Sequence, residues 1–282
     1  MTTQEQLQDL IAQNLTELKE LLRFFLIIYD WDGVFTSTER MSHFAALNVL
    51  ALYNDDMLSE VDKMEFSNRL FGIKVVNQRP IMEEFFREKG LDVYFPKHFD
   101  GLRDAEQLRM FEGLQTVEGM HEMAYTLNTM YANQVIASRS RVEPFVAKVT
   151  ATDMDLIIKS DDWFLPAKVD DKSQAWDNMH LIFEAEGVSP EDQGFDKVEI
   201  FSYAAASKGI VPAGCIVIED SVKGIISAKK AGMIPICFLG AEDTDNETTR
   251  KALEGILPEE QICETADELL LTILKIVMSS QR

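Results

Sequence analysis

Two carboxylates follow an apolar run near the start of the chain. The run Phe24–Tyr29 precedes Asp30 and Asp32, and Gly33 comes next. Such a run predicts a buried strand, and in open parallel sheets the active site lies beyond the carboxyl ends of the strands. A carboxylate there can attack phosphorus, and a second one can protonate the leaving oxygen and later activate water. The pattern favours Asp30 as nucleophile and Asp32 as general acid and base, with a plain Asp-Gly turn as the alternative.

A second apolar run, Cys215–Ile218, also ends in acids, Glu219 and Asp220. If the two runs are strands of one parallel sheet, these side chains and Asp30 gather at one edge, where they repel one another unless a cation lies among them. Ligation by oxygen alone suits Mg²⁺. We therefore take these acids as candidate magnesium ligands. The alternative is that Glu219 and Asp220 only cap the helix that follows.

A third apolar run, Gln134–Ala137, ends in a hydroxyl residue, Ser138, and Arg139 follows it. A serine and nearby backbone N–H groups at the end of a strand can bind a phosphate oxygen. By itself this signal is weak, because a serine after a strand is commonly part of a turn.

The elements that position these residues alternate along the chain. Two more apolar runs, Leu156–Ile158 and Ile234–Leu239, bring the predicted strands to five, and helical patterns separate them. Strands that alternate with helices predict a parallel sheet covered on both faces, which is an α/β Rossmann-like fold. Residues 39–115 break this alternation, because their apolar residues recur at helical spacing throughout. We expect them to form an inserted all-helical domain.

The domain boundaries follow from these patterns. We expect an α/β core domain made of residues 24–38 and 116–282, with the helical cap domain of residues 39–115 inserted in it. Residues 1–23 precede the core and contain leucines at helical spacing, which predicts an amphipathic helix. Its apolar face must be buried, either against the helical layer of the sheet or against a second copy of the chain in a homodimer.

The three motifs together resemble the haloacid dehalogenase superfamily. The segment DWDGVFTSTE from Asp30 resembles its first motif, Ser138–Ser140 its second, and IEDSVKGIISAKKAGM from Ile218 its fourth. Their order and spacing match the superfamily over residues 24–240. Thr38-Glu39, His43-Phe44 and Leu70-Phe71-Gly72 are similar to the helical cap of the β-phosphoglucomutase-like branch.

The resemblance implies a role for each candidate residue. Asp30 would be the nucleophile, Asp32 the acid and base, and Ser138 a phosphate ligand. Magnesium would be bound by Asp30, Asp220, Glu219 and the backbone carbonyl of Asp32.

The lysine that binds phosphate in the superfamily lacks its usual Gly-Lys-Pro context here. Two helical patterns, 174–187 and 197–209, stand where the superfamily has one. If the first pattern is the superfamily's helix, the lysine is Lys172 or Lys168. If the second is, it is Lys197.

The expected topology of the sheet gives an order of preference for the three lysines as phosphate ligands. The loop 161–173 follows the predicted strand Leu156–Ile158, so it lies at the active-site edge in either case. The order of preference is therefore Lys172, then Lys168, then Lys197. A further alternative is that Arg139 or Arg141 takes the place of the lysine.

The composition of the chain indicates which classes of partner and which cellular location to expect. The chain has 282 residues and a net charge of −21, which argues against a nucleic-acid-binding protein. No apolar stretch is long enough for a membrane span, and the first residues lack the features of a secretory signal. The three cysteines are odd in number, have no metal-ligand spacing and lie in apolar or helical patterns. This suits the reducing environment of the cytoplasm. A phosphate site in so acidic a chain requires local positive charge from metal, lysine and backbone N–H groups.

The predicted function is a magnesium-dependent phosphatase that hydrolyses a small phosphorylated metabolite, a sugar phosphate, through an aspartyl-phosphate. One alternative is a phosphomutase of the β-phosphoglucomutase type, which returns the phosphoryl group to the sugar. Another is a non-catalytic member of the superfamily. A 2-haloacid dehalogenase is disfavoured, because that chemistry needs neither Asp32 nor a metal.

Overall fold

The structure is a computed structural model, and it consists of two compact units. One unit is made of Met1–Ser37 with Gln115–Arg282, and the other of Thr38–Leu114. We call them the core unit and the helical unit. The residues described are 2–54, 58–71, 73, 75–140, 142–165, 197–241 and 246–280.

The described part of the core unit contains a six-stranded parallel sheet with the order β3-β2-β1-β4-β5-β6. The central strand β1 pairs with β2 on one side and with β4 on the other. This sheet confirms the predicted α/β Rossmann-like fold. The strands are β1 (Leu26–Tyr29), β2 (Asn133–Ala137), β3 (Trp163–Phe164), β4 (Cys215–Glu219), β5 (Ile234–Phe238) and β6 (Ile262–Cys263).

Both edge strands differ from the prediction. The expected strand Leu156–Ile158 is wrong, because Met154–Leu156 forms a 3₁₀ turn and Leu156 is largely exposed. The strand at this edge is β3, later in the chain, and β6 at the other edge was not predicted. Each edge strand has two residues, which is too short for the alternation of apolar and polar residues that marks a strand.

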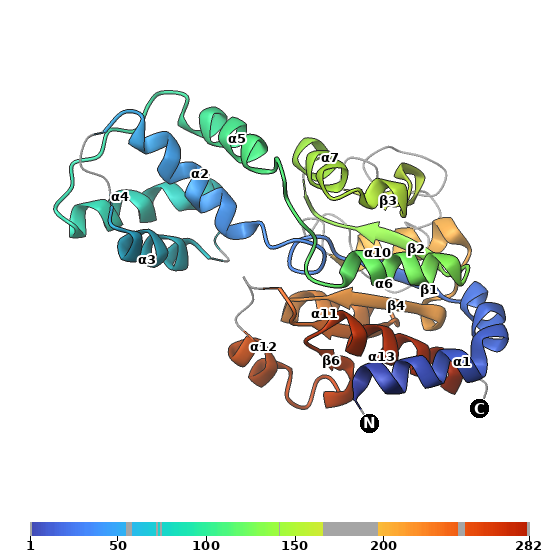
Figure 1. Cartoon of the computed structure of the whole chain (residues 1–282). Helices are drawn as coiled ribbons and strands as arrows, with labels where there is room; N and C mark the ends of the chain where they lie inside the picture. The colour runs from blue at the N-terminus through green and yellow to red at the C-terminus, as the bar shows by residue number, and fades with distance from the viewer. Residues whose placement is uncertain are drawn as a thin grey trace, which may run out of the picture. The chain divides into compact units, whose positions relative to one another are not determined.

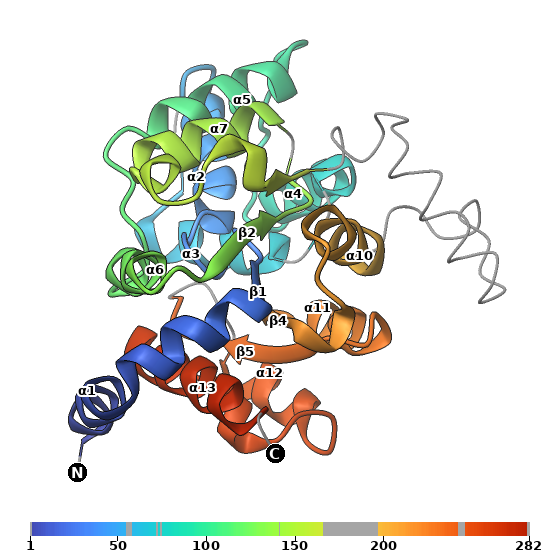
Figure 2. The same ribbon diagram turned by 90° about the vertical axis from the view of Figure 1, so that its right-hand side faces the viewer.

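Helices cover both faces of the sheet, as Figure 2 shows edge-on. One apolar cluster joins residues of α1, α6, α7 and α13 to one face, and a second cluster joins α10 and α11 to the other. Residues of α12 pack with α11 and β5 in a smaller cluster. The helices are α1 (Thr3–Leu21), α6 (Met120–Thr129), α7 (Val142–Ala151), α10 (Lys197–Lys208), α11 (Val222–Lys230), α12 (Asn246–Leu253) and α13 (Ala266–Ser279).

The N-terminal helix α1 packs along α13 within the same chain (Figure 2). It begins with a capping box, in which the Thr2 side chain accepts a hydrogen bond from the Glu5 N–H. Leu7 and Leu18 are buried, and so is Leu22 just after the helix. Most of the apolar face of the helix is therefore covered by the helical layer of the sheet, while Leu15 is 40% exposed. A homodimer through this helix stays a prediction.

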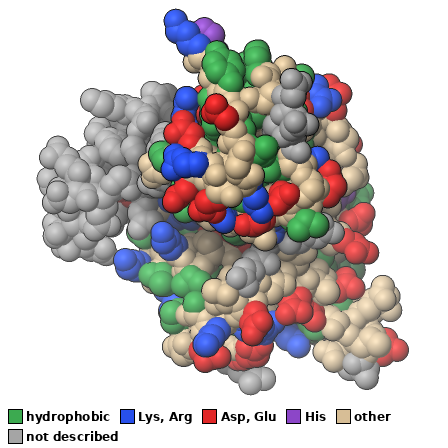
Figure 3. All heavy atoms as spheres, turned by 90° about the vertical axis from the view of Figure 1, so that its left-hand side faces the viewer, with side chains coloured by type: hydrophobic (Ala, Val, Ile, Leu, Met, Phe, Trp, Pro, Cys, Tyr) green, Lys and Arg blue, Asp and Glu red, His purple; other side chains and the backbone are tan. Residues whose placement is uncertain are grey.

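The helical unit has an apolar core of its own, built around Phe66, Phe85 and Phe86. The three rings meet with centroids 5.4–5.9 Å apart. Figure 1 shows its helices α2, α3, α4 and α5. Figure 3 shows acidic and basic side chains interspersed over the face of the molecule that it presents. The helices are α2 (Glu39–Ala51), α3 (Glu60–Leu70), α4 (Gln78–Glu88) and α5 (Phe99–Met110).

The chain leaves the core unit and returns to it at adjacent points. The Val117 N–H donates a hydrogen bond of 2.8 Å to the Phe35 carbonyl, just before the exit at Ser37 and just after the return at Gln115. The whole helical unit is thus an excursion between β1 and β2. Among the described residues, no helix is both long and apolar enough to cross a membrane.

Candidate active site

Three carboxylates meet where the central strands β1 and β4 end. Asp30 follows β1, and its N–H donates to the Ile218 carbonyl at 3.0 Å, which continues the pairing of the two strands. Glu219 ends β4 and Asp220 follows it. Each of the three acids offers one carboxylate oxygen within 4.8 Å of the others. The structure therefore brings together the acids that the sequence placed at one sheet edge.

Two glycines make room for these carboxylates. Gly33 has φ +82°, and a Cβ built on it would overlap the Asp220 carboxylate. Gly224, in the first turn of α11, leaves the corresponding space for the Glu219 carboxylate. The glycine of the first motif is thus needed for its backbone conformation and for the close approach of Asp220.

Among the described residues, the lysine that contacts these acids is Lys197. Its ammonium donates to Asp30 Oδ2 at 2.6 Å and also to Glu219 Oε1. Lys197 is the first residue of α10 and is buried. The sequence ranked it third, because its place at the active-site edge depended on α10 beginning there. The two preferred residues, Lys172 and Lys168, lie outside the described residues.

Burial and mutual repulsion set the protonation of the cluster. Burial raises the pKa of Asp30 to about 6, even though Lys197 opposes the shift. Burial and the charges of Glu219 and Asp30 raise the pKa of Asp220 well above its usual range. Burial by itself would lower the pKa of Lys197, but the neighbouring carboxylates outweigh it and raise that pKa. The lysine therefore stays charged, but its single positive charge does not offset the negative charges of the three carboxylates.

Glu219 is held on both carboxylate oxygens. Oε1 accepts from Lys197, and Oε2 accepts from the N–H and the hydroxyl of Ser221 at 3.2 and 2.9 Å. The Ser221 hydroxyl also accepts from the Gly224 N–H at 3.1 Å, which caps α11. The expected capping role of this segment thus falls to Ser221, while the Glu219 side chain points into the acidic cluster.

The acidic cluster fits a hard divalent cation. Its donors are carboxylate oxygens alone, which is the ligand set that Mg²⁺ prefers. Asp30, Glu219 and Asp220, when ionised, with the Lys197 ammonium leave two negative charges, which one divalent ion balances. The Asp32 carbonyl as a further ligand stays a prediction.

Asp32 is held by two residues that follow β2. The Ser140 hydroxyl donates to Asp32 Oδ2 at 2.7 Å, and the Lys148 ammonium donates to Asp32 Oδ1. Lys148 lies on α7 and is 4% exposed, whereas the Asp32 side chain is 38% exposed. Sequence reasoning missed Lys148, because one lysine in a helical pattern reads as a surface residue. The only signal was its position on the apolar stripe of α7, with Phe145 and Val149.

Ser138 lies at the end of β2, where the sequence placed it. It is buried, its N–H donates to the Phe164 carbonyl at 3.1 Å, and its hydroxyl accepts from the Ser140 N–H at 3.2 Å. Arg139 is exposed, and Arg141 lies outside the described residues. A phosphate-binding role for Ser138 and Arg139 stays a prediction.

His43 of the helical unit is a buried structural residue. Its Nδ1 lies 3.0 Å from the Ser67 hydroxyl, and burial with the nearby charges of Arg40 and Arg103 lowers its pKa to about 4. It is therefore neutral near pH 7.

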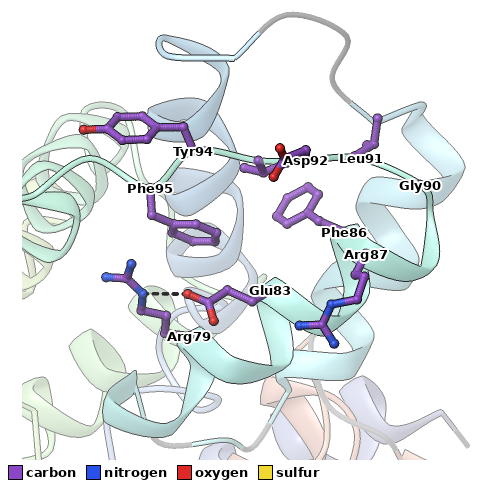
Figure 4. Close-up of a pocket in the computed structure, with 10 residues that line it drawn as sticks. Arg79, Glu83, Phe86, Arg87, Gly90, Leu91, Asp92, Tyr94 and Phe95 are labelled. Atoms are coloured by element: carbon purple, nitrogen blue, oxygen red, sulfur yellow. Dashed lines mark hydrogen bonds and ion pairs between the residues drawn. The ribbon is translucent and has the colours of Figure 1, made fainter.

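The helical unit also has a hollow of about 820 Å³, lined by Phe86, Phe95, Arg79 and Arg87 among others. Figure 4 shows Arg79 paired with Glu83 in this hollow. The Arg79 Nε and Glu83 Oε1 atoms lie 3.0 Å apart. Asp30, Glu219 and Asp220 are not among the residues that line this hollow. The hollow is large but is not lined by the acidic cluster, so we do not regard it as the reaction site.

Solved structures of known proteins share this fold, while no family model and no curated protein matches the sequence. A HAD family hydrolase from Deinococcus radiodurans R1, solved with bound phosphate and sodium, is 18% identical with a TM-score of 0.64, over 90% of this chain and 97% of the other. A haloacid dehalogenase-like protein from Agrobacterium tumefaciens is 21% identical, with a TM-score of 0.58 over 91% and 99%. A β-phosphoglucomutase from Clostridium difficile is 15% identical, with a TM-score of 0.54 over 92% and 99%. At these identities the similarity shows the fold.

Proposed function

We propose that this chain, whose fold is that of haloacid dehalogenase hydrolases and β-phosphoglucomutases, is a magnesium-dependent phosphatase. Its substrate is a small phosphorylated metabolite of the sugar phosphate class. The observation that carries the proposal is the acidic cluster with Lys197, in which a buried ammonium joins Asp30 to Glu219 at the point where β1 and β4 end. The similarity to a hydrolase solved with phosphate supports this assignment.

In the first step, Asp30 Oδ attacks the phosphorus atom and the bond to the sugar oxygen breaks. Asp32, in its protonated form, gives its proton to the departing oxygen, so that the sugar leaves as a neutral alcohol. The Lys197 ammonium faces the same carboxylate and offsets the charge of the bound phosphoryl group. Asp30, Glu219 and Asp220 would hold magnesium, which when bound would supply further positive charge to the phosphate oxygens.

In the second step, a water molecule attacks the aspartyl-phosphate. Asp32, now a carboxylate, takes a proton from that water, the bond from phosphorus to Asp30 breaks, and inorganic phosphate forms. Asp30 returns to its carboxylate form and Asp32 holds the proton for the next substrate. We propose that the helical unit serves as a cap that selects the substrate and limits the access of water.

A non-catalytic role is less consistent with the free energy that the acidic cluster costs the folded state. Carboxylates gathered in a buried site disfavour the folded state unless a cation or a proton is bound. The residues proposed for both chemical steps are present, and Asp30, Asp32, Lys197 and Asp220 lie in one region of the core unit.

The test is phosphate release from an aryl phosphate and from a panel of sugar phosphates, with magnesium or with a chelator. We expect release that requires magnesium and falls by at least about 1,000-fold in Asp30→Asn, as expected for loss of an essential nucleophile. Equal release by Asp30→Asn and the unchanged protein would exclude Asp30 as nucleophile. Conversion of the sugar phosphate to an isomer, without free phosphate, would identify a phosphomutase instead.

A further inference from the structure

We propose that Lys148 is a positioning residue that commits the aspartyl-phosphate to attack by water. It does so by holding the Asp32 carboxylate in place for the second chemical step. This inference rests on the proposed phosphatase function and deepens it.

The first observation is the double support of the Asp32 side chain. Lys148 donates to Oδ1 and the Ser140 hydroxyl donates to Oδ2, so each carboxylate oxygen has a donor. A carboxylate with one donor can still rotate about its last bond, whereas two donors from different directions fix its orientation. General base catalysis depends on that orientation, because the base must lie within hydrogen-bond reach of the water.

The second observation is the rigidity of the support itself. Lys148 is almost wholly buried, and its helix α7 is anchored by Phe145, one turn earlier. The Phe145 ring meets Trp31 at 5.4 Å and Trp163 at 5.4 Å, both edge to face. Trp31 lies between the two catalytic acids in the sequence. The packing that places α7 thus includes Trp31, the residue directly before Asp32.

The third observation is that every part of this support belongs to the core unit. Asp32, Ser140, Lys148 and Phe145 all lie outside residues 38–114. The two side chains that donate to the base, Ser140 and Lys148, thus belong to the same unit as the base itself. A mutase must keep its phosphoenzyme from water until a sugar hydroxyl is in place. A base held by donors of its own unit is suited to activate water as soon as the first product leaves.

Once the proton has gone to the leaving group, Lys148 and Ser140 keep the Asp32 carboxylate in one orientation. In the step that follows, Asp32 Oδ takes a proton from water and the water oxygen bonds to phosphorus. The bond from phosphorus to Asp30 breaks, and phosphate departs. Lys148 exchanges no proton in this step and acts by holding Asp32.

The test uses p-nitrophenyl phosphate, because its leaving group departs readily without a proton from Asp32. The variants are Lys148→Met, Lys148→Arg and, as the matched control, Lys159→Met, which removes an exposed lysine of the same unit. We expect Lys148→Met to release one equivalent of nitrophenol per enzyme rapidly, and then to turn over at least about 10-fold more slowly, as for a displaced catalytic group. Lys148→Arg should recover much of the slow phase, and Lys159→Met should match the unchanged enzyme.

The outcomes separate this inference from the function on which it rests. If the unchanged protein releases no nitrophenol with magnesium, both fail. If it is active and Lys148→Met shows the same turnover without a burst, only the positioning role of Lys148 is overturned.

A burst and a steady rate that fall together in Lys148→Met would indicate less folded enzyme, and Ser140→Ala then replaces this variant. Ser140 is partly exposed and supports the other Asp32 oxygen, so a burst followed by slow turnover is expected there too, and its absence overturns the role.

Discussion

Lys197→Met should destabilise the metal-free protein strongly, because the change leaves buried carboxylates without their cation. Lys197 is buried and bridges Asp30 and Glu219. Removal of one partner from a buried ion pair costs about 3–5 kcal/mol, so we expect this loss in the free energy of unfolding at pH 8. At pH 5 the loss should be at most about half as large, because Asp30, with a pKa of about 6, then binds a proton and needs less compensation.

The measurement is urea denaturation at pH 8 and pH 5 in the presence of a chelator. The control is Lys208→Met, which removes the lysine at the other end of the same helix. Lys208 pairs with Asp162, and both side chains remain partly exposed. That pair should contribute no more than about 1 kcal/mol. The reasoning is refuted if Lys197→Met costs no more than Lys208→Met at pH 8, or if its cost is the same at both pH values.

Two further substitutions and one pH series test the site and the sheet that carries it. Gly33→Ala should abolish magnesium-induced stabilisation, because its Cβ would displace the carboxylate beside it, whereas Gly90→Ala, with a similar φ and no neighbour within 4 Å, should bind magnesium normally in the same thermal shift assay. Tyr29→Phe should lower the free energy of unfolding by about 1–3 kcal/mol in urea titrations, since the buried Gln134 Oε1 loses its 2.7 Å donor. In metal-free protein the raised pKa of Asp30 stabilises the fold fully below pH 3.8, and about 3 kcal/mol is lost as the pH rises through 6. Above pH 6 magnesium should restore that stability, and urea titrations with magnesium or chelator will show whether it does.

The centre of the sheet could be predicted from the sequence, because each central strand is an apolar run buried on both faces. Acidic residues come directly after two of these strands. Asp30 and Asp220 could therefore be placed at one edge of the sheet from the order of the motifs. The edge strands could not, since two residues carry no period and backbone pairing alone defines them. The predicted strand Leu156–Ile158 failed because a short apolar run fits a turn as well as a strand.

The two lysines of the site show a different limit. The sequence offered Lys197 as one of three candidates, and only the point at which α10 begins brings it to Asp30. Lys148 carried no motif, because a buried lysine on an apolar helix face differs from a surface lysine only through its distant partner Asp32. Contacts between residues far apart in the chain are set by packing, and local patterns do not encode them.

The hydrogen bond from Val117 to Phe35 has a consequence for how the chain folds. Strands β1 and β2 are neighbours, yet residues 38–114 lie between them in the chain. If those residues first collapse around their own phenylalanine core, the segment that must close to pair β1 with β2 is far shorter than the sequence suggests. Each halving of the effective loop lowers the entropic cost of closure by about 0.6 kcal/mol. Mutations in the phenylalanine core should therefore slow the assembly of a sheet that those residues never enter.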